Sequence, residues 1–373
     1  NANIDLGSGS DSLALGNFAN TGTISNVETL NGGTGDDTLT IGAELSKASV
    51  DLGAGSDKLT LGDFSNLASV SNVETLIGGG LGDTITVSAQ VSNASIDLGA
   101  DNDKLTLGNF ANTATVSRVE TLIGGSGADA ITIGAALDNL HSIDLGAGSD
   151  TLALGNFANT ATISNVETIT GGTASDNITL GTVLTTSNSI DLGAGIDSLT
   201  LTNSANTGSI ANVESLIGGS GVDTITFTSQ LSNGLIDLGN GSDKLTLGNF
   251  ANTATVQNVE TVIGGSDADT IAFATSASNA SIDLGAGADK LTLSNSANKV
   301  SVSHVETLVG GMDADTVVFG AVLSNASIDL GASNDVMTLG DFANVATIAN
   351  VESVTGGSAA DTITVGAQAN SIY

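Results

Sequence analysis

The feature that most constrains this chain is an internal repeat of 46 or 47 residues, which recurs eight times. The pattern IDLG or VDLG places an aspartate at one point of every repeat: Asp5, Asp51, Asp97, Asp144, Asp191, Asp237, Asp283 and Asp329. The pattern VET or VES places a glutamate at a second point: Glu28, Glu74, Glu120, Glu167, Glu214, Glu260, Glu306 and Glu352. Because repeats bury their apolar faces on one another, we expect a single uninterrupted repeat domain over residues 1–373, uncapped at both ends.

Each repeat divides into two similar halves. Residues 53–61 read GAGSDKLTL and residues 125–133 read GSGADAITI, so glycines precede an aspartate and a short alternating run. Such alternation is typical of strands, and the Gly, Asn and Ser clusters mark turns. We therefore predict an all-β, right-handed parallel β-solenoid of about sixteen coils of roughly 23 residues. An eight-bladed β-propeller is the alternative, which the similarity of the two halves disfavours.

Composition and charge narrow the functional classes. The chain has 49 Gly, no Pro, Cys or Trp, and 40% apolar residues, so small aliphatic side chains must form the core. A net charge of −33 excludes nucleic acid and anionic membranes as electrostatic partners and favours cations. No segment is apolar enough to insert in a membrane. Without cysteine the chain has neither disulfides nor thiolate metal sites.

Two further rows of equivalent residues have structural interpretations. Six repeats share a phenylalanine, which we expect to stack in the interior: Phe18, Phe64, Phe110, Phe157, Phe250 and Phe342. Ser204 and Ser296 replace it in the other two repeats. An asparagine follows in every repeat, and we expect its side chain to satisfy backbone groups between coils. These residues are Asn20, Asn66, Asn112, Asn159, Asn206, Asn252, Asn298 and Asn344.

Residues 32–40, GGTGDDTLT, fit the nonapeptide Gly-Gly-x-Gly-x-Asp-x-aliphatic-x. The chain thereby resembles the RTX family of calcium-binding, type I-secreted bacterial proteins. Residues 124–129 and 218–223 carry the same Gly-Gly-x-Gly-x-Asp core, whereas other turns replace a glycine. The texture of the repeats also resembles bacterial surface-layer proteins and large adhesins. The first resemblance implies a β-roll or β-helix in which turn carbonyls and the Asp carboxylate hold Ca²⁺ between stacked turns.

The residues that this resemblance assigns to Ca²⁺ are the turn aspartates and the motif glycines. They are Gly33, Gly35, Asp37, Asp11, Asp57, Asp83, Asp103, Gly127, Asp129, Asp150, Asp176, Asp197, Gly221, Asp223, Asp243, Asp269, Asp289, Asp315, Asp335 and Asp361. Carboxylates stacked a few ångströms apart repel one another, which independently favours a cation. The alternative is that the turn aspartates accept backbone N–H bonds and cap the turns. We expect the Asp5-type and Glu28-type rows to be solvated carboxylates on strand faces.

These observations favour an extracellular, secreted structural β-solenoid, stabilised by Ca²⁺, that forms a surface layer, a fibre or an adhesin stalk by coil stacking. No nucleophile elbow, P-loop or metalloprotease motif is present, so we do not expect an enzyme. Self-association is the expected interaction, and a cell-surface polysaccharide is left open as a further partner. The alternative function is an ice- or surface-binding module, because Thr-x-Thr pairs such as Thr38/Thr40 and Thr84/Thr86 should point outward.

Overall fold

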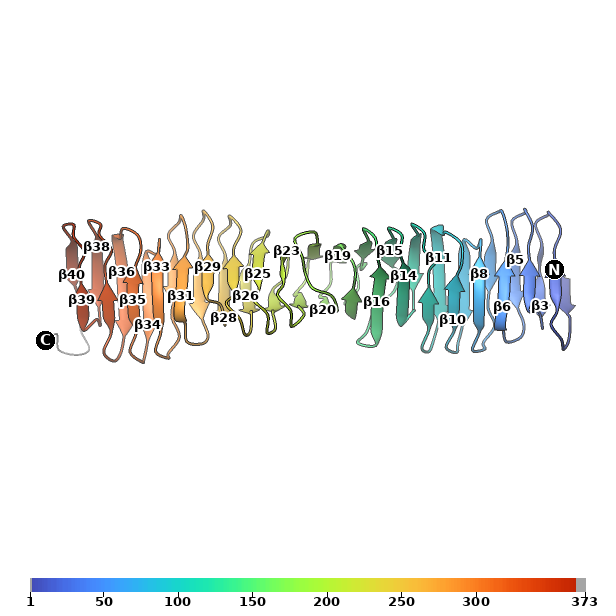
Figure 1. Cartoon of the computed structure of the whole chain (residues 1–373), viewed down its shortest axis with the longest axis horizontal. Helices are drawn as coiled ribbons and strands as arrows, with labels where there is room; N and C mark the ends of the chain where they lie inside the picture. The colour runs from blue at the N-terminus through green and yellow to red at the C-terminus, as the bar shows by residue number, and fades with distance from the viewer. Residues whose placement is uncertain (1, 367–373) are drawn as a thin grey trace. The chain divides into compact units, whose positions relative to one another are not determined.

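The computed structural model describes residues 2–366, and every regular element in that range is a β-strand. Contacts divide the chain into two compact units, one with residues 1–182 and 192–195 and the other with residues 183–191 and 196–373. In each unit the odd-numbered strands form one parallel sheet and the even-numbered strands form a second (Figure 1). The chain is a right-handed parallel β-solenoid, and the propeller alternative is excluded because all the strand pairs are parallel.

In the first unit one sheet contains β1 (Ala2–Asp5), β3 (Thr21–Ser25), β5 (Thr38–Ile41), β7 (Lys58–Thr60), β9 (Thr75–Gly79), β11 (Ser92–Gly99), β13 (Thr113–Ser117), β15 (Ala130–Ile133), β17 (Thr151–Ala153) and β19 (Thr168–Gly172). The other sheet contains β2 (Ser12–Ala14), β4 (Thr29–Asn31), β6 (Ser46–Asp51), β8 (Leu67–Ser71), β10 (Thr84–Val87), β12 (Lys104–Thr106), β14 (Thr121–Gly125), β16 (His141–Gly146), β18 (Thr160–Ser164) and β20 (Asn177–Leu180).

In the second unit one sheet contains β23 (Thr207–Ala211), β25 (Thr224–Phe227), β27 (Lys244–Thr246), β29 (Thr261–Ile263), β31 (Ser278–Asp283), β33 (Lys299–Ser303), β35 (Thr316–Phe319), β37 (Val336–Thr338) and β39 (Ser353–Thr355). The other contains β22 (Ser198–Thr200), β24 (Ser215–Ile217), β26 (Ser232–Asp237), β28 (Thr253–Gln257), β30 (Thr270–Phe273), β32 (Lys290–Thr292), β34 (Thr307–Gly311), β36 (Ser324–Gly331), β38 (Val345–Ala349) and β40 (Thr362–Val365). Strand β21 (Ser189–Gly193) has residues in both units.

The length of one turn corrects the predicted coil of 23 residues. Strand β3 pairs with β1 at an offset of 20 residues (Asp5 with Ser25) and with β5 at an offset of 17 (Thr21 with Thr38). The first repeat contributes β1 to β5 and the second contributes β6 to β10. Five strands at two per turn make two and a half turns per repeat, so equivalent strands of successive repeats fall alternately in the two sheets.

The core consists of aliphatic columns inside the solenoid. In β5 the residues Leu39 and Ile41 are 2% and 1% exposed, whereas Thr38 and Thr40 lie outside, as predicted from the alternation. Leu39 pairs in register with Leu59 of the next turn in the same sheet. Burial of such a side chain contributes about 2 kcal/mol to stability. A single turn buries only part of its apolar surface, and the neighbouring turns cover the rest.

The prediction of an interior phenylalanine stack is wrong. The six Phe side chains, Phe18, Phe64, Phe110, Phe157, Phe250 and Phe342, are between 37% and 77% exposed. They lie in the turns between strands rather than in the alternating runs, so their common position in the repeat did not reveal which side of the wall they occupy. The interior is instead filled mainly by Leu, Ile, Val and Ala, with three phenylalanines from another position of the repeat, Phe227, Phe273 and Phe319.

Candidate functional site in the corners of the solenoid

The predicted turn aspartates lie at the corners where the chain leaves one sheet for the other. Each group of four successive turns presents Asn, Asp, Asp and Glu side chains at one corner, and we call this group a corner quartet. The first unit contains Asn20–Asp37–Asp57–Glu74, Asn66–Asp83–Asp103–Glu120 and Asn112–Asp129–Asp150–Glu167. The second unit contains Asn206–Asp223–Asp243–Glu260, Asn252–Asp269–Asp289–Glu306 and Asn298–Asp315–Asp335–Glu352.

Within a quartet the backbone N–H groups of the Asn and of both Asp residues donate to a side-chain oxygen of the next turn. The backbone and amide nitrogens of Asn66 both donate to Asp83 Oδ1 at 2.9 Å. The Asp83 N–H donates to Asp103 Oδ1 at 2.6 Å, and the Asp103 N–H donates to Glu120 Oε2 at 2.7 Å. Since corner backbone groups cannot join the sheet ladder, these side chains complete the bonding between turns.

All sixteen predicted turn aspartates take part in such bonds. Those outside the complete quartets are Asp11, whose N–H donates to Glu28; Asp176, which accepts from Asn159; Asp197, whose N–H donates to Glu214; and Asp361, which accepts from Asn344. The predicted asparagine ladder is confirmed, because Asn66 Oδ1 accepts the Leu45 N–H of the neighbouring turn and Asn66 Nδ2 donates to the Gly62 and Phe64 carbonyls. The prediction that the Glu28-type residues are solvated strand-face carboxylates is wrong, because their Oε2 atoms cap the corner backbone.

The quartet aspartates are buried beyond what their bonds require. Asp37, Asp57, Asp83 and Asp103 are at most 2% exposed, and each has a buried Oδ2 atom without a hydrogen-bond partner. The same holds for Asp129, Asp150, Asp223, Asp243, Asp289 and Asp335. A buried carboxylate with one unsatisfied oxygen is costly in its charged form.

Burial also raises the pKa of several corner aspartates. Loss of solvation raises the pKa of Asp103 from 3.8 to about 7, although the bond from the Asp83 N–H opposes the shift. The pKa of Asp243, Asp289 and Asp335 is raised to about 6 by the same desolvation, with a contribution from neighbouring carboxylates. Burial at these four aspartates therefore shifts the equilibrium toward the neutral acid.

The motif glycines permit close contact between successive turns. A Cβ atom on Gly35 would collide with the backbone of Phe18 and Ala19, and one on Gly127 or Gly221 would meet the equivalent backbone of its own preceding turn. Gly33 has φ of 124°, a conformation that other residues rarely adopt. Backbone packing alone thus accounts for these four glycines.

The corner side chains bear on the predicted calcium sites in two opposite ways. The buried Oδ2 atoms of ten quartet aspartates have no hydrogen-bond partner, whereas the Oδ1 atoms are already used by N–H groups. Calcium takes about six to eight oxygen ligands, yet among residues 2–366 no three Asp, Glu or His side chains gather as a metal site would require. The Oδ1 atom of each quartet aspartate already accepts one or more N–H groups. Calcium binding by the predicted residues therefore stays a prediction, and the capping alternative has direct geometric support.

The Asp5-type residues lie on the outer side of the strands, as predicted, but they also have a bonding role. Asp51 Oδ1 accepts the Gly53 N–H at 3.1 Å and the Asn72 side-chain N–H at 2.7 Å. Asn72 has φ of 54°, a region that asparagine tolerates better than most residues. Arg118 and His304 occupy the equivalent position in two repeats and contact Asp97 and Asp283. We call these pairs outer staples.

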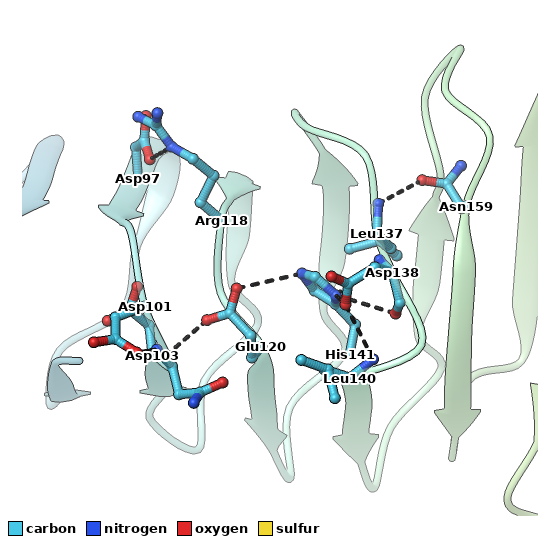
Figure 2. Close-up of polar contacts among 11 residues, drawn as sticks. Asp97, Asp101, Asp103, Arg118, Glu120, Leu137, Asp138, Leu140, His141 and Asn159 are labelled. Carbon is cyan, nitrogen blue, oxygen red and sulfur yellow. Dashed lines mark hydrogen bonds and ion pairs between the residues drawn. The ribbon is translucent and has the colours of Figure 1, made fainter. Parts of the chain in front are cut away.

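One corner contains a histidine that the sequence analysis did not single out as functional. Figure 2 shows Glu120 between Asp103 and His141. The Asp138 N–H donates to His141 Nδ1 at 2.9 Å, while His141 Nε2 lies 3.6 Å from Glu120 Oε1. His141 is only 7% exposed and stands where four other repeats have a buried alanine, namely Ala48, Ala94, Ala280 and Ala326. The 47-residue spacing from Asp97 to Asp144 is the signal that could have identified this irregular corner.

Comparisons with known proteins assign no family to this chain. No protein-family model matches the chain, and no curated protein matches its sequence significantly. A solved structure that it resembles is a hyperactive, Ca²⁺-dependent, β-helical antifreeze protein from an Antarctic bacterium. The match has 20% identity and a TM-score of 0.24, and covers 85% of this chain and 83% of that chain. Residues 2–366 of this chain include no helix that could span a membrane.

Proposed function

We propose that this chain is a structural β-solenoid of an extracellular protein, serving as part of a surface layer, a fibre or an adhesin stalk. The observation that carries the proposal is the use of the corner carboxylates. They accept backbone N–H groups of adjacent turns inside the wall, so the acidic residues maintain the stack instead of facing a substrate. Self-association of such stacks is part of this proposal.

The lining of a surface pocket also supports a structural role. A pocket of about 340 Å³ in the second unit is lined by Leu216, Leu235 and other residues of three neighbouring strands. Its single titratable residue, Asp237, is an outer-staple residue that accepts hydrogen bonds from Gln257 and Asn258. This lining offers neither a nucleophile with its base nor a pair of free carboxylates.

Protease shaving of intact source cells tests the extracellular assignment. An antibody against this chain should detect its fragments in the supernatant while a cytoplasmic marker stays inside the cells. Protection of the chain until the cells are lysed would overturn the proposal. Sedimentation velocity of the purified chain over a range of concentrations tests self-association. A chain that stays monomeric at every concentration would contradict the proposed self-association.

Calcium binding at the turns is a separate question from the structural role. The nonapeptide at residues 32–40 is the observation that supports it, and the bonding of Asp37 Oδ1 to Asn20 counts against an ion at the same oxygen. The fold that we describe needs no ion to satisfy the backbone of its corners. Chelation therefore separates the two interpretations.

Ice binding is the second candidate, because threonines cluster on one outer surface. Across β3, β5 and β7, Thr23 pairs with Thr40, and Thr40 pairs with Thr60. Thr38 and Thr40 are exposed. However, the equivalent pair Thr84 and Thr86 lies on β10, in the other sheet, because each repeat makes two and a half turns. The Thr pairs therefore do not form one uninterrupted array on one face.

An ice-recrystallisation assay distinguishes this candidate from a purely structural role. Ice binding predicts inhibition by the natural chain and its loss in Thr40→Tyr, whose ring would disturb the flat surface. An unchanged crystal size with the natural chain would eliminate the candidate. Thermal unfolding of both proteins serves as the control for folding.

A further inference from the structure

The corner phenylalanines form exposed platforms outside the wall. Phe64 is 37% exposed, Phe110 44% and Phe18 77%, although phenylalanine is a residue that usually contributes to cores. An exposed Asn or Asp precedes each ring, namely Asn17, Asp63, Asn109, Asn156, Asn249 and Asp341. Each platform thus combines one aromatic ring with an adjacent hydrogen-bonding side chain.

Each ring lies against a glycine two residues earlier. A Cβ atom on Gly62 would be 2.9 Å from the Cδ2 and Cε2 atoms of Phe64, and Gly248 relates to Phe250 in the same way. Glycine occupies this position in all six repeats that have the phenylalanine. The ring is therefore seated on the backbone of its own turn, which fixes its orientation.

The fold does not require these rings. Where Ser296 replaces phenylalanine, Ser294 replaces the glycine, and its hydroxyl donates to Asn298 Oδ1 at 3.1 Å. The Asn298 side chain donates to the Ser294 and Ser296 carbonyls at 3.0 and 2.6 Å. In a phenylalanine repeat Asn252 makes the equivalent bonds to residues 248 and 250 at 3.0 and 2.7 Å. The turn is thus closed equally well without the ring.

The spacing of the rings argues against a protein partner. In the second unit Phe250 and Phe342 are separated by five turns at one corner. The corner residues of successive turns there are Asn252, Asp269, Asp289, Glu306, Leu323 and Asn344. At about 4.8 Å per turn this is roughly 24 Å. Isolated rings at this distance do not make the contiguous patch, about 800 Å² per partner, that a stable second copy would need.

We propose that the phenylalanine corners bind a neutral polysaccharide. A sugar ring presents an apolar C–H face that stacks on an aromatic ring and a rim of hydroxyls that bonds to neighbouring amides or carboxylates. The net charge of −33 disfavours acidic chains. A long repetitive ligand also matches platforms that recur along the solenoid, where several weak contacts sum to useful avidity. This inference rests on the proposed extracellular function.

The test exchanges the two natural types of corner. In the loss variant the six phenylalanines become serine, as at Ser204 and Ser296, for example Phe64→Ser. The glycines are kept, because a Cβ atom on Gly62 would lie 2.8 Å from the Ile41 carbonyl oxygen and Gly155 has φ of 74°. In the gain variant the two remaining corners become Gly-x-Phe through Thr202→Gly, Ser204→Phe, Ser294→Gly and Ser296→Phe. Affinity electrophoresis in gels containing dextran or hydroxyethyl cellulose measures binding, and polygalacturonate serves as the acidic probe.

The natural chain should be retarded by at least one neutral probe and not by polygalacturonate. The loss variant should bind about tenfold or more weakly, the gain variant should bind more tightly, and both should melt like the natural chain. No retardation of the natural chain, unchanged binding by the loss variant, or a large drop in its melting temperature would each overturn the proposal. A change in oligomeric state in place of polysaccharide binding would identify a second copy as the partner, which also overturns it. Protease shaving reports on cell-surface exposure independently of these results.

Discussion

The corner quartets and the outer staples use the same residue type in two different settings. Asp83 accepts two hydrogen bonds from Asn66 of the preceding turn, and Asp51 accepts one from the Gly53 N–H and one from Asn72 of the following turn. Asp83 is 1% exposed and retains an unpartnered Oδ2 atom, whereas Asp51 lies partly open to solvent on the outer side of its strand. Similar hydrogen bonding therefore has very different electrostatic consequences, and solvent contact causes the difference.

Replacing an aspartate with alanine should give the largest difference in stability between a corner quartet and an outer staple. Asp129→Ala leaves both Asn112 donors without their acceptor inside the wall, so we expect a loss of about 3 kcal/mol. Asp144→Ala removes bonds from Gly146 and Asn165 on the outer side, where water replaces them, and should cost about 1 kcal/mol. Chemical unfolding of both variants measures the difference, and equal losses would contradict the distinction.

The pH dependence of stability is the next largest expected effect. The folded-state pKa values of Asp103, Asp243, Asp289 and Asp335, at about 6 to 7, exceed the ordinary value of 3.8. The folded chain therefore binds more protons than the unfolded chain between these limits, and stability falls as the pH rises through them. The melting temperature should increase on acidification from about pH 8 to about pH 5. A decrease over this range would contradict the account.

Asp103→Asn sharpens the comparison at a single site. The amide keeps an acceptor for the Asp83 N–H but removes the charge, so the variant should lose part of the pH dependence. Asp51→Asn on the outer side is the matched control for the exchange of a carboxyl group for an amide. The slope of melting temperature against pH between about 5 and 8 is the measurement.

The smallest effect is expected at an outer staple. Asn72→Gly keeps the positive φ but removes the hydrogen bond to Asp51, at a cost of about 1 kcal/mol. Asn72→Ala loses the same bond and also strains the backbone, so it should be less stable than Asn72→Gly. The reverse order would show that the backbone conformation at residue 72 contributes nothing.

The sequence predicted the solenoid because the strands alternate and the repeat is regular. It also predicted the role of Asn66 and its equivalents, since asparagine in turns bonds to backbone groups. The turn length was wrong because two similar halves suggested two coils, whereas the repeat contains five strands. Two and a half turns per repeat place Thr40 and Thr86 in different sheets, and this cannot be read from the spacing of equivalent residues alone.

The corners were harder to predict because one residue type suits two roles. Asp37 fits both a calcium nonapeptide and a cap for the N–H of Asn20, and only the folded structure shows that its Oδ1 atom accepts that N–H. Phe18 illustrates the same limit, because its position in a turn does not indicate whether the ring faces the core or the solvent. Side-chain direction at a corner depends on the packing of adjacent turns, which the repeat pattern does not contain.

Thermal unfolding with and without calcium tests most directly whether the corner carboxylates hold the turns by themselves. The far-ultraviolet circular dichroism of the purified chain should show the same β-sheet signal in excess EDTA and in millimolar calcium. Its melting temperature should agree within about 2 °C, because an ion that does not bind the folded state cannot stabilise it. Loss of the β-sheet signal in EDTA, or a melting temperature that climbs steadily with calcium, would contradict the account and favour ion binding at the turn aspartates.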